Sequence, residues 1–422
     1  MRNLLVDWIL VPCLRAFDYI CPKDASSWVF ATHFIKTSSF IENPRAVFEL
    51  VKAVPEIRKI IFYRGDKIEF TIDDAVNYEI VRLGSFRGFW LLVRSKVIFL
   101  SNSVAMDFSL REASGGFHIL KLALQKHIVV NLWHGIPLKR MFYVANAEVR
   151  EHTGRVSYRQ RERKYYSGLV ASSDVDSYVM AATFFPLNYK QIWLTGLPRN
   201  DFLLQDLECM PKDLFEQILL VRKLKNGKRL ITYAPTYRQS TKTSKASYYQ
   251  FSQDQINNLK ELLEKHNAIF GFRMHYFRND DRLFNIENYV DNEYIFDLGH
   301  EALAEIAPAI RESDIVVSDY SSVFIEAIYA NKPIIGFAYD LEQYKENLEG
   351  LLYDYEMVFP GPVVSDFDQL LNQIDNEFIH QNQVGSHAYE RAKKFFFKYQ
   401  DTDNSQRVVD RVNDLLEHKG GL

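Results

Sequence analysis

Cysteine is scarce in this chain, and so are recognisable metal-binding patterns. The three cysteines, Cys13, Cys21 and Cys209, are too few and too far apart for a disulfide framework or a zinc site. Neither HxxH nor CxxC occurs, and we expect no Asp-x-Asp pair that holds a metal ion. These absences predict a reducing compartment and a function that uses neither a bound metal nor a cofactor.

An excess of one charge and a phosphate-binding glycine loop are missing too. Lysine and arginine number 51 and aspartate and glutamate 54, which gives a net charge of −3. This balance does not favour a nucleic-acid partner. The pattern GxxxxGK[ST] is absent, which argues against an ATPase. A chain of 422 residues with 47% hydrophobic residues is typical of a globular protein with about two or three domains.

No apolar run is long enough to cross a bilayer, which takes about 20 residues. The first 20 residues are apolar, but Arg2, Asp7, Arg15 and Asp18 interrupt them, and no small-residue cleavage site follows. A signal peptide is therefore not expected. Two interpretations stay open for this segment: an interfacial helix with its charges on one face, or a helix packed on the core, which we favour.

Short β-branched and aromatic runs alternate with helical patterns along the chain. The predicted strands are 28–31, 60–63, 97–100, 128–132, 169–171, 192–194, 230–233, 268–272, 294–298, 315–317 and 334–337. The predicted helices include 117–126, 323–330 and one that Ser365 caps. The alternation predicts an α/β fold with two doubly wound domains, 1–195 and 196–422, the last helix packing back on the first domain. Such a pair would bind its ligand at the carboxyl ends of the strands, in the cleft between the halves.

One histidine stands directly after a predicted strand. Strand 128–132 leads into the sequence WHGIP at 133–137, where glycine and proline favour a tight turn. A lone histidine is usually structural, but this position at a strand end makes His134 a candidate general base. Lys139 and Arg140 follow, and they either attract phosphate or complete a helix.

Three strands of the second half are followed by side chains that suit phosphate. These are Thr236 and Arg238 after strand 230–233, Arg273 and His275 after strand 268–272, and Asp319, Ser321 and Ser322 after strand 315–317. Because the carboxyl ends of parallel strands share one edge of a sheet, these groups would surround a nucleoside diphosphate. A helix that Ser321 or Ser322 caps would add its N–H groups.

The same stretch leaves simpler interpretations open. The turn at 319–322 could be an ordinary capped turn, Arg273 could form a salt bridge, and His275 could be a core histidine. Glu326 falls one residue too late to close a capping box with Ser322, and we expect it to point into a cleft.

A basic segment lies between residues 150 and 164. Its arginines include Arg159, Arg161 and Arg163, and tyrosines are interleaved with them. The segment predicts either a surface for an anionic lipid or a polyphosphate chain, or a solvated helix face.

Five segments, taken in order, resemble the motifs of the CDP-glycerol glycerophosphotransferases, the teichoic-acid primases and polymerases and their capsule-building relatives. They are WHGIPLKR at 133–140, TGLPRND at 195–201, YAPTYR at 233–238, RMHY at 273–276 and SDYSS at 318–322. Weaker similarities include ENP at 42–44 and NKPII at 331–335. The resemblance covers roughly residues 38 to 410.

The resemblance implies a GT-B fold, in which two Rossmann-like halves face each other across a cleft, and a metal-free transferase that stands alone. The donor, CDP-glycerol or CDP-ribitol, would lie in the C-terminal half. A lipid-linked saccharide or a polyol-phosphate polymer would enter from the N-terminal half as the acceptor. The resemblance makes His134 the base, places Arg273 and His275 near the pyrophosphate, and carries the 319–322 turn and Glu326 over to the donor site. Separately from the resemblance, residues 1–20 and the basic segment 150–164 predict peripheral attachment to an anionic membrane surface, at the cytoplasmic face of the cell membrane.

The chain departs from the family pattern at a few positions. Ile136 stands where threonine is common, Glu326 where aspartate is more usual, and Leu348-Glu349-Gly350 replaces an Arg-Gly pair. The lost arginine removes one expected phosphate contact, so the identity of the polyol stays open. The alternatives are a GT-B glycosyltransferase that uses a nucleotide sugar, and an inactive relative that binds an anionic envelope polymer.

Overall fold

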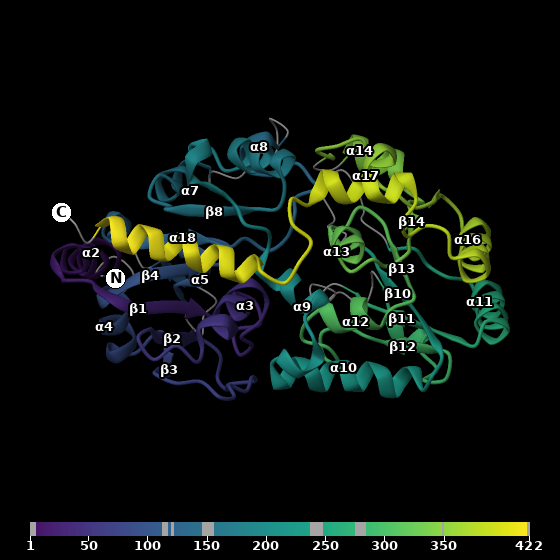
Figure 1. Cartoon of the computed structure of the whole chain (residues 1–422), viewed down its shortest axis with the longest axis horizontal. Helices are drawn as coiled ribbons and strands as arrows, with labels where there is room; N and C mark the ends of the chain where they lie inside the picture. Colours follow the sequence, from purple (N-terminus) through teal and green to yellow (C-terminus); the bar gives the residue numbers. More distant parts are fainter. Residues whose placement is uncertain are drawn as a thin grey trace. The chain divides into compact units, whose positions relative to one another are not determined.

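The computed structural model describes residues 6–111, 117–119, 122–145, 156–236, 248–274, 284–347 and 350–419. The chain divides into two compact units, the first made of 1–135, 152–202 and 401–422 and the second of 136–151 and 203–400. Each unit is an α/β domain built on a parallel sheet (Figure 1). The predicted α/β class is therefore confirmed, while the boundary at 195 and the roles of the two domains stay predictions.

The first unit contains a seven-stranded parallel sheet in the order β3-β2-β1-β4-β7-β8-β9. Its strands are β1 Asp24–Ala31, β2 Arg58–Tyr63, β3 Tyr78–Arg82, β4 Ser95–Leu100, β7 Ile128–Asn131, β8 Gly168–Ala171 and β9 Ile192–Leu194. The central strands are buried on both faces, which explains why continuous apolar runs revealed them. The strand order reverses between β1 and β4, the point at which such sheets bind ligands.

The helices of the first unit include the last helix of the chain. They are η1 Val6–Leu10, α2 Val11–Ile20, α3 Glu42–Val51, α4 Phe86–Arg94, η2 Leu124–Lys126, α5 Val104–Asp107, α7 Val156–Arg163, α8 Asp174–Thr183, η4 Tyr189–Gln191, η5 Pro198–Asn200 and α18 Asn404–Lys419. Helix α18 packs against α3 and η5 (Figure 1). Asp201 holds its start, because the carboxylate accepts hydrogen bonds from the backbone N–H of Asn404 at 3.0 Å and of Ser405 at 2.8 Å.

The prediction of a helix over 117–126 is wrong. Residues Phe117–Ile119 form strand β6, which pairs antiparallel with β5, Ser109–Arg111. Only the three residues Leu124–Lys126 form a helical turn, η2. The apolar spacing of this segment fits a helix, but pairing with a neighbouring segment decides its conformation.

The second unit contains a six-stranded parallel sheet in the order β12-β11-β10-β13-β14-β15. Its strands are β10 Arg229–Ala234, β11 Ala268–Phe272, β12 Ile295–Asp297, β13 Ile315–Ser318, β14 Ile334–Phe337 and β15 Val363–Val364. This order is that of the Rossmann fold, and it reverses between β10 and β13. Thr236 and the 319–322 turn follow these two strands, so the predicted donor residues flank the reversal point.

Helices cover this second sheet as well. They are η3 Phe142–Val144, α9 Asp201–Leu204 at the border between the units, η6 Leu207–Cys209, α10 Lys212–Lys225, α11 Gln253–Lys265, η7 Ile286–Asn288, α12 Ala307–Glu312, α13 Val323–Tyr329, α14 Leu341–Asn347, α15 Tyr355–Val358, α16 Phe367–His380 and α17 His387–Phe396. The predicted cap Ser365 is wrong by one position, because the Asp366 side chain accepts the hydrogen bond from the N–H of Gln369 at 2.8 Å.

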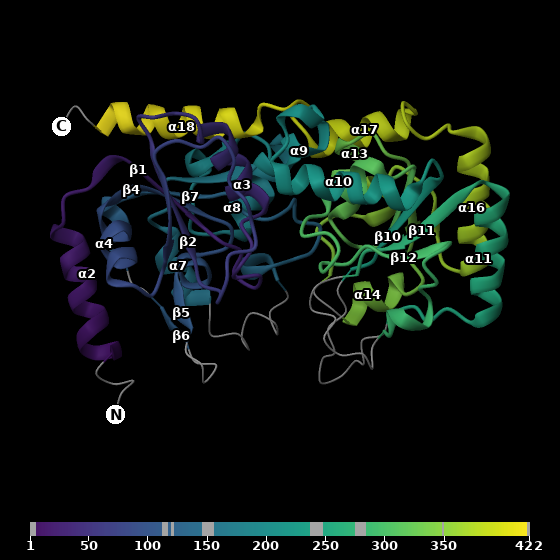
Figure 2. The same cartoon turned by 90° about the horizontal axis from the view of Figure 1, so that it is seen from below.

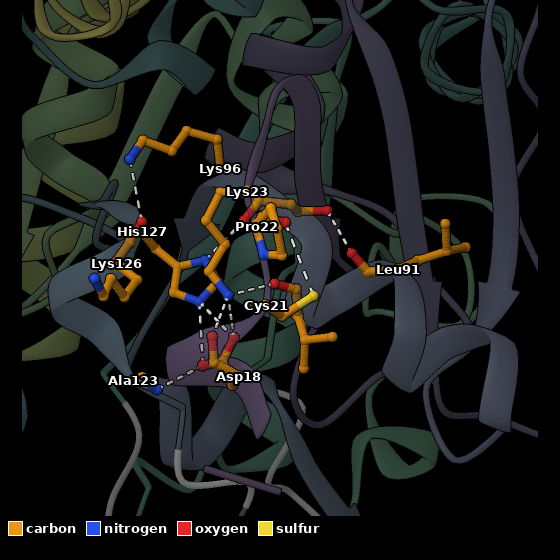
Figure 3. Close-up of polar contacts among 11 residues, drawn as sticks. Asp18, Cys21, Pro22, Lys23, Leu91, Lys96, Ala123, Lys126 and His127 are labelled. Carbon is orange, nitrogen blue, oxygen red and sulfur yellow. Dashed lines mark hydrogen bonds and ion pairs between the residues drawn. The ribbon is translucent and has the colours of Figure 1, made fainter. Parts of the chain in front are cut away.

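A buried carboxylate anchors helix α2 to the first unit (Figure 3). Asp18 is fully buried, and its carboxylate lies 2.6 Å from Lys23 Nζ and 3.1 Å from His127 Nε2. The backbone N–H of Ala123 donates to the same carboxylate at 2.6 Å. Burial alone would raise the pKa of Asp18, but the hydrogen bonds from His127 and Lys23 outweigh it and lower the pKa. Asp18 therefore faces the core, as the favoured interpretation of a helix packed on the core expects, and does not lie on an exposed charged face.

Among the described residues, no helix combines the length and the hydropathy that crossing a membrane requires.

Candidate active site

The candidate base lies on a strained turn at the end of β7. Trp133 has φ of 52° and Gly135 has φ of 152°, and a positive φ is rare for a residue as bulky as tryptophan. The rings of Trp133 and His134 are 3.9 Å apart between centroids. The strand therefore ends in a turn that sets the direction of the histidine ring.

Burial lowers the pKa of His134 to about 4, because the surrounding protein removes water that would solvate the charged ring. Glu42 raises this pKa, whereas the positive charge of Arg199 and the neighbouring His33 lower it. The imidazole is thus neutral across the physiological pH range. A neutral imidazole can accept a proton, which is the property that a general base needs.

Three residues beside His134 were not singled out as site residues from the sequence. The carboxylate of Glu42 lies 3.5 Å from Nη1 of Arg199, and Nδ1 of His33 accepts hydrogen bonds from the N–H groups of Ile35 and Lys36 at 3.3 and 3.1 Å. Glu42 and Arg199 belong to two of the family-like segments. Glu42 and Arg199 are far apart in the sequence, so no local pattern could show that both lie beside His134.

In the second unit, two predicted donor residues meet at the reversal point of the sheet. The backbone N–H of Thr236 donates to Oδ1 of Asp319 at 2.7 Å. Tyr355 donates from its hydroxyl to the carbonyl of Asp319 at 2.9 Å. Thr236 and Asp319 are buried, whereas Ser321 and Ser322 are partly exposed. Hydroxyl groups are therefore accessible at the strand ends where the sequence predicted them.

The start of α13 differs in detail from the prediction. Ser322 occupies the N-cap position, but its side chain makes no capping hydrogen bond. The hydroxyl of Ser321 instead accepts a long hydrogen bond of 3.4 Å from the N–H of Val323. Glu326 is buried, with 4% of its surface exposed, so the prediction that it points into a cleft is wrong. Its position inside the first turn of α13 directs it toward the protein interior.

Arg273 is engaged by its own unit. Its Nη1 donates to the carbonyls of Leu298 at 2.8 Å and Leu303 at 2.7 Å, and its Nη2 lies 3.3 Å from Nδ1 of His300. Burial lowers its pKa to about 10, while Asp297 and Glu305 act in the opposite direction. The guanidinium thus holds the segment after β12, and its predicted bridge to a pyrophosphate gains no support from these contacts.

Lys139 and Arg140 lie in the second unit, together with the predicted donor residues. The segment 138–140 pairs with 350–352, and Nε of Arg140 donates to the carbonyl of Leu351 at 3.1 Å. The Lys139 ammonium lies 5.7 Å from the ring centroid of Tyr344, which stacks at 4.1 Å on Tyr320 of the 319–322 turn. Lys139 therefore lies near the 319–322 turn, and its assignment to an acceptor or lipid surface stays a prediction.

Only some of the arginines in the basic segment 150–164 are exposed as predicted. Arg161 is exposed, but Arg163 is 4% exposed and its guanidinium lies 4.5 Å from the ring centroid of Phe184. Arg163 is therefore withdrawn from the predicted surface, because its side chain packs inside the first unit. The side chain of Arg159 and the residues Arg238 and His275 lie outside the described part of the structure.

The expectation that no Asp-x-Asp pair occurs needs a correction. Three pairs have this spacing, and they are 174/176, 366/368 and 401/403. Asp176 is buried and accepts a hydrogen bond from the N–H of Ser172 at 2.8 Å. Asp366 accepts the hydrogen bond that caps α16, and Asp401 is paired with Arg407 at 2.7 Å. Burial raises the pKa of Asp176 to about 7, which does not suit a metal ligand in an open site. Within the described ranges, no group of three or more metal-ligating side chains comes together.

Comparison with known proteins adds independent findings. A family model for CDP-glycerol:poly(glycerophosphate) glycerophosphotransferases matches residues 15–414. The chain is 24% identical to the teichoic acid poly(glycerol phosphate) polymerase of Bacillus spizizenii, over 93% of this chain and 93% of that protein. It is 28% identical to the teichoic acid poly(ribitol-phosphate) polymerase of the same species, over 70% of this chain. That match spans 44% of the ribitol-phosphate polymerase, so the chain corresponds to less than half of that relative.

Solved structures share the architecture. A structure of the wall teichoic acid polymerase TagF matches with a TM-score of 0.74 and 20% identity, covering 97% of this chain and 93% of that chain. At this level of identity the similarity concerns the fold alone. It confirms the predicted GT-B-like fold, with two parallel-sheet α/β domains.

Proposed function

Because the chain belongs to the CDP-glycerol:poly(glycerophosphate) glycerophosphotransferase family, we propose that it transfers glycerol phosphate from CDP-glycerol to a hydroxyl group. The acceptor is a lipid-linked saccharide or a growing polyol-phosphate polymer, and the product serves a teichoic-acid-like or capsule polymer. The acceptor oxygen bonds to the phosphorus next to glycerol, the bond from that phosphorus to the bridging oxygen breaks, and CMP leaves.

His134 takes the proton of the acceptor hydroxyl in this proposal. The observation that carries the assignment is the position of His134 on a turn with positive φ at the end of β7, where its neutral imidazole can accept a proton. General-base help of this kind contributes about 10²–10⁴-fold in rate. Replacing His134 should therefore cost most of the activity without unfolding the chain.

The donor phosphates lie near the 319–322 turn in this proposal. Support comes from the accessible hydroxyls of Ser321 and Ser322, from the reversal point of the Rossmann-like sheet, and from Lys139 beside Tyr344. A lysine ammonium is a common partner for phosphate and would offset the charge of the leaving CMP. Arg273 supports this edge of the sheet indirectly by holding the segment after β12.

A donor screen tests the function. CDP-glycerol, CDP-ribitol and a nucleotide sugar are each incubated with the purified chain and one lipid-linked acceptor, and released nucleotides are separated by chromatography. We expect acceptor-dependent CMP from CDP-glycerol, and a rate about 10²–10⁴-fold lower for His134→Ala. His380→Ala is the matched control, because it removes an exposed histidine of α16. Release of a nucleoside diphosphate from the sugar donor would favour a glycosyltransferase, and no turnover of any donor would favour an inactive binding protein.

CDP-ribitol is the second candidate donor. The chain's similarity to the ribitol-phosphate polymerase, at 28% identity, favours keeping it beside CDP-glycerol. The same screen separates the two polyols through their relative kcat/KM values.

We also propose that the protein attaches to the cytoplasmic face of the cell membrane through a surface formed by α2 and α4. This α2–α4 surface comprises Phe17 and Ile20 of α2, Phe86 and Trp90 of α4, and Trp8 of η1, which directly precedes α2. Phe86 is 98% exposed, Trp8 76% and Ile20 74%, and the rings of Phe17 and Trp90 are 6.1 Å apart between centroids. Figure 2 shows α2 beside α4 at the end of the unit where the chain begins. Exposed aromatic side chains of this kind are typical of interfacial helices.

Arg15 is exposed on α2 and would attract an anionic leaflet, contributing on the order of 1 kcal/mol, whereas the exposed Arg87 of α4 is paired with Glu79 at 2.6 Å. Phe86→Ser combined with Trp90→Ser should release the protein from phosphatidylglycerol vesicles in a sedimentation assay. Ile379→Ser, which removes an exposed apolar side chain of the second unit, is the control. Equal binding of both variants and of the unchanged chain would place the membrane contact elsewhere.

A further inference from the structure

The two peptide groups on either side of Trp133, the residue before His134, are held by buried asparagine side chains. Trp133 adopts a backbone conformation with φ of 52°, which side chains other than glycine and asparagine rarely adopt. Such a conformation persists only where the surrounding structure fixes it. The hydrogen bonds of the Trp133 peptide therefore show what fixes the turn.

Asn131 holds the N–H group of Trp133. Its Oδ1 accepts the hydrogen bond from the N–H of Trp133 at 2.8 Å, and its Nδ2 donates to the carbonyl of Asn102 at 2.9 Å. Asn131 is the last residue of β7 and is fully buried. The side chain thus ties the turn to the neighbouring strand end.

Asn43 holds the carbonyl side. Its Nδ2 donates to the carbonyls of Leu132 at 3.1 Å and Trp133 at 2.8 Å. Its Oδ1 accepts the hydrogen bond from the N–H of Arg199 at 2.8 Å. Asn43 lies in the first turn of α3 and is fully buried. One side chain therefore connects three segments that are distant in the sequence.

We propose that Asn43 and Asn131 are positioning residues for the reaction, which clamp the Trp133 peptide so that the His134 ring is held at the place where it accepts the proton. This role of Asn43 and Asn131 rests on the proposed function of His134 as the general base. An amide side chain is required at both positions, because each donates one set of hydrogen bonds and accepts another. Aspartate would lose the donor, and an apolar residue would leave buried carbonyl groups without partners.

Alanine variants test the clamp in the full chain. Asn43→Ala and Asn131→Ala should each lower kcat about 10- to 100-fold, because a shift of about 1 Å in a catalytic group costs up to about 100-fold. The KM for CDP-glycerol should change little. Asn404→Ala is the matched control, since Asn404 is fully buried in the same unit and bonds to Asp201 without contacting the turn. If Asn43→Ala does not fold, Asn43→Asp keeps the shape and the acceptor, and the same loss is expected.

A double-mutant comparison separates positioning from general stability. In a His134→Ala background, Asn43→Ala should lower kcat by less than about twofold further, because its effect acts through the missing ring. A further loss as large as that in the unchanged chain would overturn the proposal, as would an unchanged kcat in the single variants.

A second readout needs no turnover. Histidine-selective NMR titration gives the pKa of His134 directly, and in Asn43→Ala it should rise from about 4 toward the ordinary value of about 6.5, because a released turn lets water reach the ring. An unmoved pKa would overturn the clamp. If the unchanged chain turns over no donor, the proposed function fails, while this titration still decides whether the asparagines hold the turn.

Discussion

At the residue scale, the proposed general-base mechanism requires a neutral His134. Its folded pKa of about 4 keeps the imidazole neutral down to that pH. We therefore predict that kcat stays level from pH 8 to about pH 5.5, because the base form is already complete over this range. An unperturbed histidine would instead lose activity with a midpoint near about pH 6.5.

Initial rates at saturating CDP-glycerol, with circular dichroism at each pH to confirm folding, make this comparison. A fall in kcat with a midpoint near about pH 6.5 in a folded protein would contradict the assignment.

The residue scale is also where the sequence was least informative. The WHG segment pointed to His134, but nothing in the local pattern pointed to Glu42, Asn43 or Arg199 as its neighbours. Long-range packing of α3 and η5 brings them together. In the same way, an arginine in a basic segment such as Arg163 is expected at the surface. Only the structure, in which Arg163 packs on Phe184, shows that it is buried.

At the scale of elements, α2 depends on its anchor at Asp18. Removing one partner of a buried ion pair leaves the other charges without compensation, which costs about 3–5 kcal/mol. We predict that Asp18→Ala lowers the free energy of unfolding of the first unit by about this amount at pH 7, because Lys23 and His127 lose their carboxylate. Denaturant unfolding measures the change.

The pH dependence of this contribution has a definite sign. The folded pKa of Asp18 is lower than its ordinary value of 3.8, so the stabilisation is present above that value and is lost as the pH falls through the folded pKa. Asp368→Ala, at an exposed position in α16, is the control and should cost far less. Equal effects of the two substitutions at pH 7 would show that the buried contacts of Asp18 do not stabilise the unit.

Strands could be predicted from the sequence where burial on both faces requires a continuous apolar run. Residues 28–31 of β1 and most residues of β4, β10, β13 and β14 are apolar and buried on both faces, so their sequence runs identify them. The prediction of a helix over 117–126 failed because residues 117–119 pair with 109–111. The local periodicity of a segment carries no information about such pairing with another segment. The N-cap of α16 is Asp366, whereas the prediction was Ser365. A difference of one residue is usual between predicted and observed helix ends.

At the scale of the whole molecule, two parallel sheets reverse their strand order at comparable points. In the first sheet the reversal lies between β1 and β4, and in the second between β10 and β13. Residues that follow these strands or their neighbours include His33 and His134 in the first unit, and Thr236 and Asp319 in the second. The fold thus explains why chemistry-bearing residues scattered through the sequence recur at strand ends.

The central claim is that the phosphorus next to glycerol is transferred together with the polyol. CDP-glycerol that carries ³²P at this phosphorus, incubated with the full chain and a lipid-linked saccharide ending in glycerol phosphate, tests it most directly. We expect the label to move into the lipid-linked product and the released nucleotide to be unlabelled CMP. Label recovered in CDP, with glycerol transferred alone, or a label that never leaves CDP-glycerol, would contradict it.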